Sequence, residues 1–152
     1  MILSQQWLEQ YLGHEGSKIA VGTTSLRSLE SFHWIGAKLI VTGELSPLGQ
    51  FEAYTLNPSL TVTETYSALL DALKERGIME LALHTQLMIK PGYSFKTVQG
   101  IVTNFHQPGS TLLLLVSAGV GEQWRDIYTH ALDHDYRFLS YGDSSLLLFK
   151  GN

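Results

Sequence analysis

The sequence contains no cysteine. A disulfide framework, a zinc site built on cysteine ligands and a thiol nucleophile are therefore excluded. A long apolar run is also missing, because the longest one, which begins at Leu112, is much shorter than the roughly 18 residues that a membrane span needs. The first residues, MILSQQW, have neither the basic flank nor the apolar region of a signal peptide. These absences lead us to expect a cytoplasmic protein with no membrane partner.

Cationic side chains are few, since 10 Lys and Arg stand against 14 Asp and Glu and the formal net charge is -4 at pH 7. This balance argues against a broad basic surface for nucleic acid, although a local patch is invisible in the sum. The 152 residues are 44% hydrophobic, which is enough to form a buried core. No repeat or linker interrupts them, so we expect a single domain over residues 1–152.

Strand-like and helix-like segments alternate along the chain, which predicts an α/β fold with a mixed, mainly parallel sheet covered by helices. The best-marked helix begins at Thr61 and Glu64, which form a capping box, and Ser4 is placed to cap the first helix. After Ser110 an apolar run predicts a buried helix, in which Leu114→Ala should cost about 2–5 kcal/mol. We expect strands at residues 18–22, 37–43, 51–56, 96–103 and 144–150, and helices at 4–13, 24–34, 61–77, 110–119 and 121–135.

The stretch VGTTSLR places a glycine and three hydroxyl side chains, Thr23, Thr24 and Ser25, between a predicted strand and a predicted helix. Free backbone N–H groups and the helix dipole favour an anion at such a junction. The alternative is an ordinary tight turn with a capping hydroxyl. Arg27 similarly has two interpretations: a surface ion pair with Glu30, or a bidentate contact with a substrate oxygen.

The stretch TNFHQPGST, residues 103–111, holds more polar chemistry than a strand-to-helix junction needs. His106 titrates near neutral pH and lies in a loop, which makes it the best acid/base candidate. Asn104 is placed to orient a substrate, and Ser110 or Thr111 to cap the next helix. The alternative is that His106 and Asn104 only satisfy a buried turn.

Two further stretches carry candidate residues. In KPGYSF, Tyr93 either stacks on a base or lies at the edge of the core. In YRFLSYGDSS, Arg137, Tyr141 and Asp143 line a polar pocket near a turn, or else Arg137 only pairs with Asp135 or Asp143 at the surface. His130 and His134 are four residues apart on a predicted helix, but the sequence offers no third metal ligand, so we expect no metal site.

Several familiar signatures are missing. The sequence contains no phosphate-binding loop of the G-x-x-x-x-G-K-[ST] type, no complete dinucleotide fingerprint and no G-x-S-x-G elbow. However, three blocks together resemble the C-terminal part of the S-adenosylmethionine:tRNA ribosyltransferase-isomerase family of queuosine biosynthesis. These blocks are IAVGTTSLRSLES, HTQLMIKPGYSFKTVQGIVTNFHQPGSTLLLLVSA and YRFLSYGDSSLLL.

The resemblance implies an unusual reaction, in which the ribosyl part of S-adenosylmethionine is transferred and isomerised. The acceptor is 7-aminomethyl-7-deazaguanine in tRNA, and the products are epoxyqueuosine, adenine and methionine. No metal or bound cofactor is implied, because S-adenosylmethionine is a co-substrate. The family is more than twice as long as this chain, so the resemblance also implies a C-terminal fragment that needs an N-terminal half and is inactive alone.

The resemblance assigns roles to individual positions. Thr24 and Ser25 are expected to hold the methionine carboxylate, and His106 or Asp143 to move a proton. Tyr93 or Tyr141 is expected to stack on a purine-like ring. The matching family positions are Thr23, Thr24, Ser25, Arg27, Glu30, Pro91, Gly92, Tyr93, Thr103, Asn104, Phe105, His106, Pro108, Arg137, Tyr141, Gly142 and Asp143.

Two positions depart from the family, because Met88 and Lys90 stand where it often has an aromatic residue and a tyrosine. The segment from Phe32 to Ala82 is also longer than the connection in the family. Two other functions stay open from the residues alone. One is a non-catalytic nucleotide- or RNA-binding module of the same fold, and the other is a different α/β small-molecule transferase.

Overall fold

A computed structural model of the chain describes residues 1–56, 59–107 and 109–149. These residues form two compact units. Unit 1 consists of Met1–Gly16 and Arg27–Met88, and unit 2 consists of Ser17–Leu26 and Ile89–Asn152. Whether the two units fold as one domain, as the sequence led us to expect, stays a prediction.

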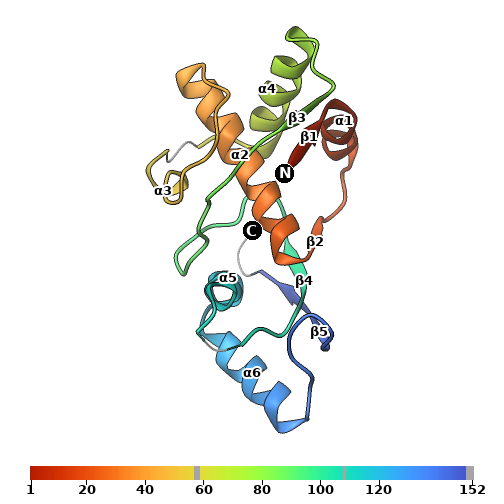
Figure 1. Cartoon of the computed structure of the whole chain (residues 1–152), viewed down its shortest axis with the longest axis vertical. Helices are drawn as coiled ribbons and strands as arrows, with labels where there is room; N and C mark the ends of the chain where they lie inside the picture. The colour runs from red at the N-terminus through yellow and green to blue at the C-terminus, as the bar shows by residue number, and fades with distance from the viewer. Residues whose placement is uncertain (57–58, 108, 150–152) are drawn as a thin grey trace. The chain divides into compact units, whose positions relative to one another are not determined.

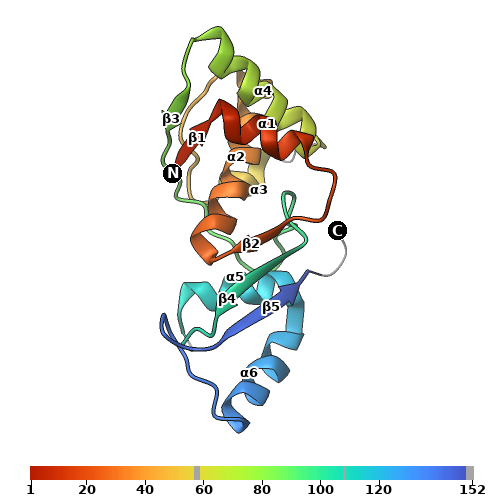
Figure 2. The ribbon, with the colours of Figure 1, turned by 90° about the vertical axis from the view of Figure 1, so that its right-hand side faces the viewer.

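Unit 1 is mainly helical (Figures 1 and 2). It contains β1 (Ile2–Ser4), α1 (Gln5–Gly13), most of α2 (Thr23–Thr42), α3 (Ala53–Leu56), α4 (Val62–Glu75) and β3 (Glu80–Ala82). β1 and β3 pair antiparallel, and α1 packs against α4. The core of this unit is formed by large apolar and aromatic side chains, among them Leu3, Leu8, Ile35, Tyr66, Leu69 and Leu73.

The helix starts in unit 1 follow the predicted capping residues. The Ser4 hydroxyl accepts a hydrogen bond of 3.2 Å from the backbone N–H of Trp7. Thr61 and Glu64 form the predicted capping box, in which each side chain accepts a backbone N–H of the other residue. The Glu64 carboxylate accepts the Thr61 N–H and also the Thr61 hydroxyl, and these two bonds, above all the one from the N–H, lower the pKa of Glu64. The capping predictions are therefore confirmed.

Residues 37–43, predicted as a strand, instead continue helix α2, so this prediction is wrong. The prediction relied on the β-branched residues near Val41 and on Gly36 and Gly43 as strand boundaries. However, residues 30–37 are all buried, so this part of the helix shows no amphipathic period that could be followed into residues 38–42, where Ile40 and Val41 are exposed. Gly36 lies in the middle of α2, where α4 passes close to it. Gly43, with a φ of 75°, follows Thr42, the last residue of α2.

Gly36→Ala is expected to destabilise the protein by about 1–3 kcal/mol, because an added Cβ overpacks this crossing. That Cβ would clash with the carbonyl oxygen of Thr65 and lie 2.9 Å from its carbonyl carbon. Gly13→Ala is the matched control, since nothing lies within 4 Å of its Cβ position. Urea unfolding of the chain checks both variants, and equal midpoints would contradict the close approach.

The predicted strand at 51–56 is also wrong, because its last residues form the short helix α3. The turn before it is held by Glu52, whose carboxylate accepts the Gly49 N–H at 2.8 Å and pairs with Lys38 at 2.7 Å. The Tyr54 hydroxyl donates to the Met88 carbonyl, 3.0 Å away. The contacts with Lys38 and Met88 come from distant positions in the chain, so the alternation of FEAYTL could not reveal them.

Unit 2 is built around a three-stranded sheet with the order β2–β4–β5 (Figure 2). Its elements are β2 (Ile19–Val21), the first residues of α2, β4 (Gly100–Asn104), α5 (Thr111–Val120), a 3-10 turn η1 (Gly121–Gln123), α6 (Trp124–Asp133) and β5 (Ser144–Leu148). β2 is parallel to β4, whereas β5 is antiparallel to it. The mixed α/β class is confirmed, but the mainly parallel sheet is wrong, because two of the three strand pairings in the described residues are antiparallel.

One face of this sheet is buried. Ala20, Ile101 and Leu147 are in register across the three strands and are almost inaccessible. Helix α5 packs against β5 and buries Leu115 and Val116. None of the helices in the described ranges is long and apolar enough to cross a membrane.

Candidate active site

The three blocks that carry the predicted site residues meet at one edge of the sheet of unit 2. Because β2 and β4 are parallel, their carboxyl ends lie at the same edge, and the Gly22 N–H donates to the Val102 carbonyl at 2.8 Å. β5 runs the other way and therefore starts at this edge, with Ser144 opposite Asn104. The topology thus brings together residues 22–25, 103–106 and 137–144. Ligands of open α/β sheets bind at the carboxyl ends of strands.

The residues after β2 begin helix α2 directly. Gly22 has a φ of 87°, a left-handed conformation that suits glycine. Its carbonyl accepts the Leu26 N–H at 3.1 Å, so Thr23, Thr24 and Ser25 form the first helical turn. Thr24 and Ser25 are exposed. Their predicted contact with an anion stays a prediction.

His106 is held from two directions. Its Nε2 lies 3.0 Å from the Thr103 hydroxyl, and its backbone N–H donates to the Tyr128 hydroxyl at 3.1 Å. The imidazole is partly buried, and desolvation lowers its pKa below the ordinary value of 6.5. His106 is therefore neutral at pH 7, the form that accepts a proton.

Asn104 connects two of the blocks. Its Nδ2 donates to the Gly142 carbonyl at 3.0 Å and to the Ser144 hydroxyl at 3.3 Å. The amide is thus used to fix the turn before β5. If Asn104 orients a substrate, as predicted, it would do so through its amide oxygen.

Arg137 and Asp143 close the turn before β5. The Asp143 carboxylate accepts the Arg137 backbone N–H at 2.7 Å and the guanidinium Nη2 at 3.1 Å. The hydrogen bonds from the Arg137 side chain lower the pKa of Asp143, which is therefore ionised at neutral pH. The predicted surface pair between these residues is confirmed. An ionised carboxylate can accept a proton or carry a negative charge, but it has no proton to donate.

Gly142→Ala is expected to disrupt this turn. An added Cβ would clash with the Arg137 carbonyl oxygen and lie 2.6 Å from its carbonyl carbon. The turn must then open, which removes the Asn104 bond to the Gly142 carbonyl. Amide hydrogen exchange should show faster exchange at the Arg137 and Asp143 amides, and unchanged rates there would contradict the close packing.

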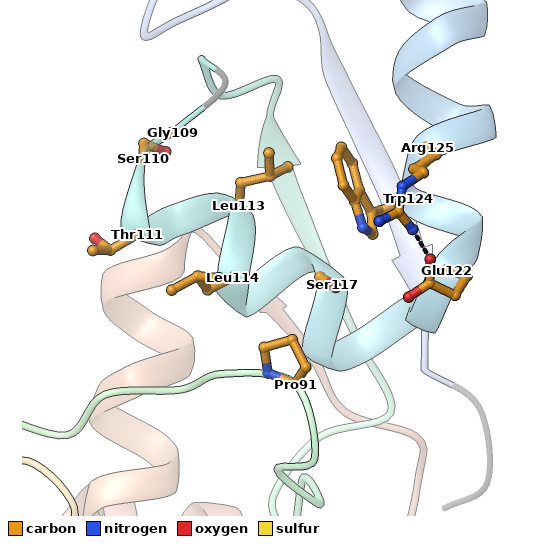
Figure 3. Close-up of a pocket in the computed structure, with 10 residues that line it drawn as sticks. All are labelled: Pro91, Gly109, Ser110, Thr111, Leu113, Leu114, Ser117, Glu122, Trp124 and Arg125. Atoms are coloured by element: carbon orange, nitrogen blue, oxygen red, sulfur yellow. Dashed lines mark ion pairs between the residues drawn. The ribbon is translucent and has the colours of Figure 1, made fainter.

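A pocket of about 380 Å³ lies beside the TNFHQPGST stretch (Figure 3). Volumes of this order suit small-molecule ligands. Trp124 and Arg125 stack as a cation–π pair at 5.0 Å, and Arg125 also pairs with Glu122. The residues that line the pocket are Pro91, Gly109, Ser110, Thr111, Leu113, Leu114, Ser117, Glu122, Trp124 and Arg125.

An aromatic pair joins this pocket to His106. The rings of Trp124 and Tyr128 meet edge to face at 6.0 Å, and the Tyr128 hydroxyl accepts the His106 N–H. Beyond their place on an amphipathic helix, no pattern in the sequence marks Trp124 or Tyr128 as site residues. Ser110 occupies the predicted N-cap position of α5 but makes no capping bond, and its hydroxyl is buried without a hydrogen-bond partner in the described part of the chain.

The remaining predicted residues are in the core, in unit 1, in the solvent or outside the described residues. Tyr93 is 7% exposed and packs against Phe95, which agrees with its alternative place in the core. Arg27 belongs to unit 1, and Glu30 beside it is fully buried, so a solvated surface pair of these residues is wrong. Tyr141 is 98% exposed. Pro108 lies outside the described residues.

The two helical histidines do not form a wider cluster. His134 Nδ1 lies 2.8 Å from the His130 carbonyl oxygen, and the two rings stack. Among the residues that the structure describes, no group of three or more His, Cys, Asp or Glu is arranged to hold a metal ion.

Known proteins resemble this chain over most of its length. An S-adenosylmethionine:tRNA ribosyltransferase-isomerase of Erythrobacter litoralis is 42% identical over 138 residues, which are 90% of this chain and 28% of that protein. The enzyme of the same name from Cupriavidus metallidurans is 51% identical over 87% of this chain and 27% of its own length. The chain thus spans little more than a quarter of these curated relatives.

A solved structure and a family model agree with these relatives. The crystal structure of an S-adenosylmethionine tRNA ribosyltransferase from Thermotoga maritima matches with a TM-score of 0.60 and 28% identity, over 97% of this chain and 39% of that one. The model of the family described as "Queuosine biosynthesis protein" matches residues 5–147. Because this match covers nearly the whole chain, the protein belongs to the queuosine biosynthesis protein family.

Proposed function

We propose that this chain is the part of an S-adenosylmethionine:tRNA ribosyltransferase-isomerase that supplies acid/base and substrate-holding groups. The observation that carries the proposal is the meeting of three polar blocks at one edge of the sheet of unit 2. The enzyme transfers the ribosyl group of S-adenosylmethionine to 7-aminomethyl-7-deazaguanine in tRNA and isomerises it to epoxyqueuosine. Its relatives bear the name of this activity.

His106 is the proton acceptor in this proposal. A base must be unprotonated at the working pH, and burial keeps the His106 imidazole in that form. A proton acidified by the adjacent sulfonium of S-adenosylmethionine is its target. The hydroxyl of Thr103, 3.0 Å from Nε2, fixes the orientation of the ring.

The other groups hold the substrates. The hydroxyls of Thr24 and Ser25 and the N–H groups of the first turn of α2 suit the methionine carboxylate. The exposed ring of Tyr141 is available to stack on a purine-like base. The Arg137–Asp143 pair holds a carboxylate at the same edge, and a direct approach of a carboxylate oxygen to the sulfonium would favour the cation, although Arg137 offsets the net charge of the pair.

This chain needs more of the enzyme in order to act. It matches only 27–28% of the length of the curated relatives. A site that encloses a substrate needs walls on more than one side, and this chain supplies only some of them. The proposed partners are therefore S-adenosylmethionine, the tRNA and the N-terminal half of the enzyme. The reaction takes place in the cytoplasm and uses no metal or bound organic cofactor.

A chimera tests the proposal. The matching segment of the Erythrobacter litoralis enzyme is replaced by residues 5–147 of this chain, and S-adenosylmethionine labelled in the ribosyl group is incubated with substrate tRNA. Label is expected in the tRNA, as with the parent enzyme. A folded chimera that binds tRNA without transferring label would instead show a non-catalytic RNA-binding module.

A further inference from the structure

The sheet of unit 2 has a second face that is apolar and exposed. On β2, Ile19 and Val21 point away from the buried Ala20, and on β5, Leu146 and Leu148 point away from the buried Leu147. Val21, Leu146 and Leu148 are each more than half exposed. Together with Val102 on β4, these residues form what we call the open sheet face, which consists of Ile19, Val21, Val102, Leu146 and Leu148.

The open sheet face is continuous across the three strands. The pairing places Val21, Val102 and Leu146 in one row and Ile19, Gly100 and Leu148 in the next. Gly100 has no side chain, and Ile19 Cδ1 and Leu148 Cδ2 each lie 3.2 Å from the place a Cβ would occupy. The two side chains therefore close over the glycine and leave no polar gap between the edge strands.

The open sheet face differs in composition from the solvated face of an ordinary sheet. A sheet with one solvated face alternates apolar and polar residues, whereas a sheet covered on both faces has apolar residues throughout. Neither row of the open sheet face contains a charged side chain. Contiguous exposed apolar surface on a folded protein marks an interaction site.

The length of the relatives indicates what covers this face. The Thermotoga maritima structure matches 97% of this chain, but the match accounts for only 39% of that protein. The larger part of the enzyme fold thus lies outside the region that this chain supplies. We propose that the open sheet face is the docking surface for that larger part, which rests on the part of the proposed function that makes this chain one segment of the larger enzyme.

The position of the face gives this docking a consequence for the site. Asn104 and Ser144 continue the same face beyond the apolar rows, at the edge where the candidate site lies. An element that covers Val102 and Leu146 therefore reaches Asn104 next. Docking closes the candidate site from this side and supplies its missing wall.

A Leu146→Lys substitution tests the docking surface. In the isolated chain Leu146 is 59% exposed, so the lysine should leave the melting temperature unchanged. In the chimera described above, the same lysine should lower the melting temperature by several degrees, because it buries a charge in the interface. Leu132→Lys is the matched control, since Leu132 is 64% exposed on α6 and lies outside the sheet.

The contrast between isolated chain and chimera decides the result. Equal effects of Leu146→Lys in both proteins would overturn the proposal. The proposal would also be overturned if the isolated chain formed a dimer that Leu146→Lys dissociates while the chimera is unaffected. The open sheet face would then bind a second copy of this chain. If the lysine prevents the chimera from folding, the milder Val21→Thr should lower its melting temperature relative to the isolated chain.

These readouts separate docking from catalysis. A melting temperature that falls only in the chimera supports docking, even where the unsubstituted chimera transfers no label and the proposed activity is wrong. An active chimera whose stability ignores Leu146→Lys contradicts docking and leaves the activity in place.

Discussion

A His106→Ala variant of the chimera is expected to transfer the ribosyl group about 10²–10⁴-fold more slowly than the unsubstituted chimera, the usual loss when a general base is removed. Its fold should be preserved, because the bond between the His106 backbone N–H and Tyr128 does not use the imidazole. Single-turnover transfer of label measures the loss. Unchanged turnover would remove His106 from the mechanism.

The pH dependence gives an independent test of the same residue. Because burial lowers the pKa of His106, transfer should stay level as the pH falls to 6.5 and decline only below it. The unfolded chain binds a proton more readily than the folded one in that range, so stability also decreases as the pH falls from 6.5 through the folded pKa. Replacing His106 with Ala should remove this part of the pH dependence of urea unfolding.

Leu115→Ala is expected to lower the free energy of unfolding by about 2–5 kcal/mol, the range for a buried leucine that leaves a cavity. Leu115 is 2% exposed on the side of α5 that faces the protein interior. Urea unfolding of the isolated chain measures the change. A decrease in the free energy of unfolding below 1 kcal/mol would contradict the prediction and would show that the neighbouring side chains fill the space left by Leu115.

Leu114→Ala is the matched control and corrects a prediction from the sequence. Leu114 was expected to be buried, but it is 41% exposed and lines the pocket beside Pro91. Its substitution removes little buried area, and alanine is the better helix former, so its effect should be much smaller than that of Leu115→Ala. A run of four leucines has no period, so the sequence could not distinguish the buried leucines from the exposed one.

The sequence predicts those parts of the fold that depend on local chemistry. Ser4, Thr61 and Glu64 mark helix starts through bonds within four residues, and these starts are confirmed. The continuation of α2 past Gly36 depends on the approach of Thr65, which is far away in the chain. The direction of β5 similarly depends on pairing with β4, and no local pattern separates parallel from antiparallel strands.

The site is predictable to the level of blocks. The sequence singled out the stretches that contain Thr24, His106 and Asp143, and the topology of unit 2 brings these stretches to one edge. The local partners Arg137 and Asp143 were predictable, but the partners of His106 and Asn104 were not, because Tyr128 and Gly142 reach them through tertiary packing. The segments that carry little of the family resemblance, residues 1–17 and 32–82, lie almost entirely in unit 1.

The leucines on both faces of β5 have a consequence for folding. A shift of one residue usually moves apolar side chains into water and is therefore penalised. In β5, however, Leu146, Leu147 and Leu148 succeed one another, so a shifted pairing exposes as much apolar surface as the native one. The alignment must instead be selected by Gly100, where the Leu147 carbonyl oxygen lies 2.5 Å from the place that a Cβ would occupy, and by the Asn104–Ser144 bond. These two contacts protect the strand against misalignment.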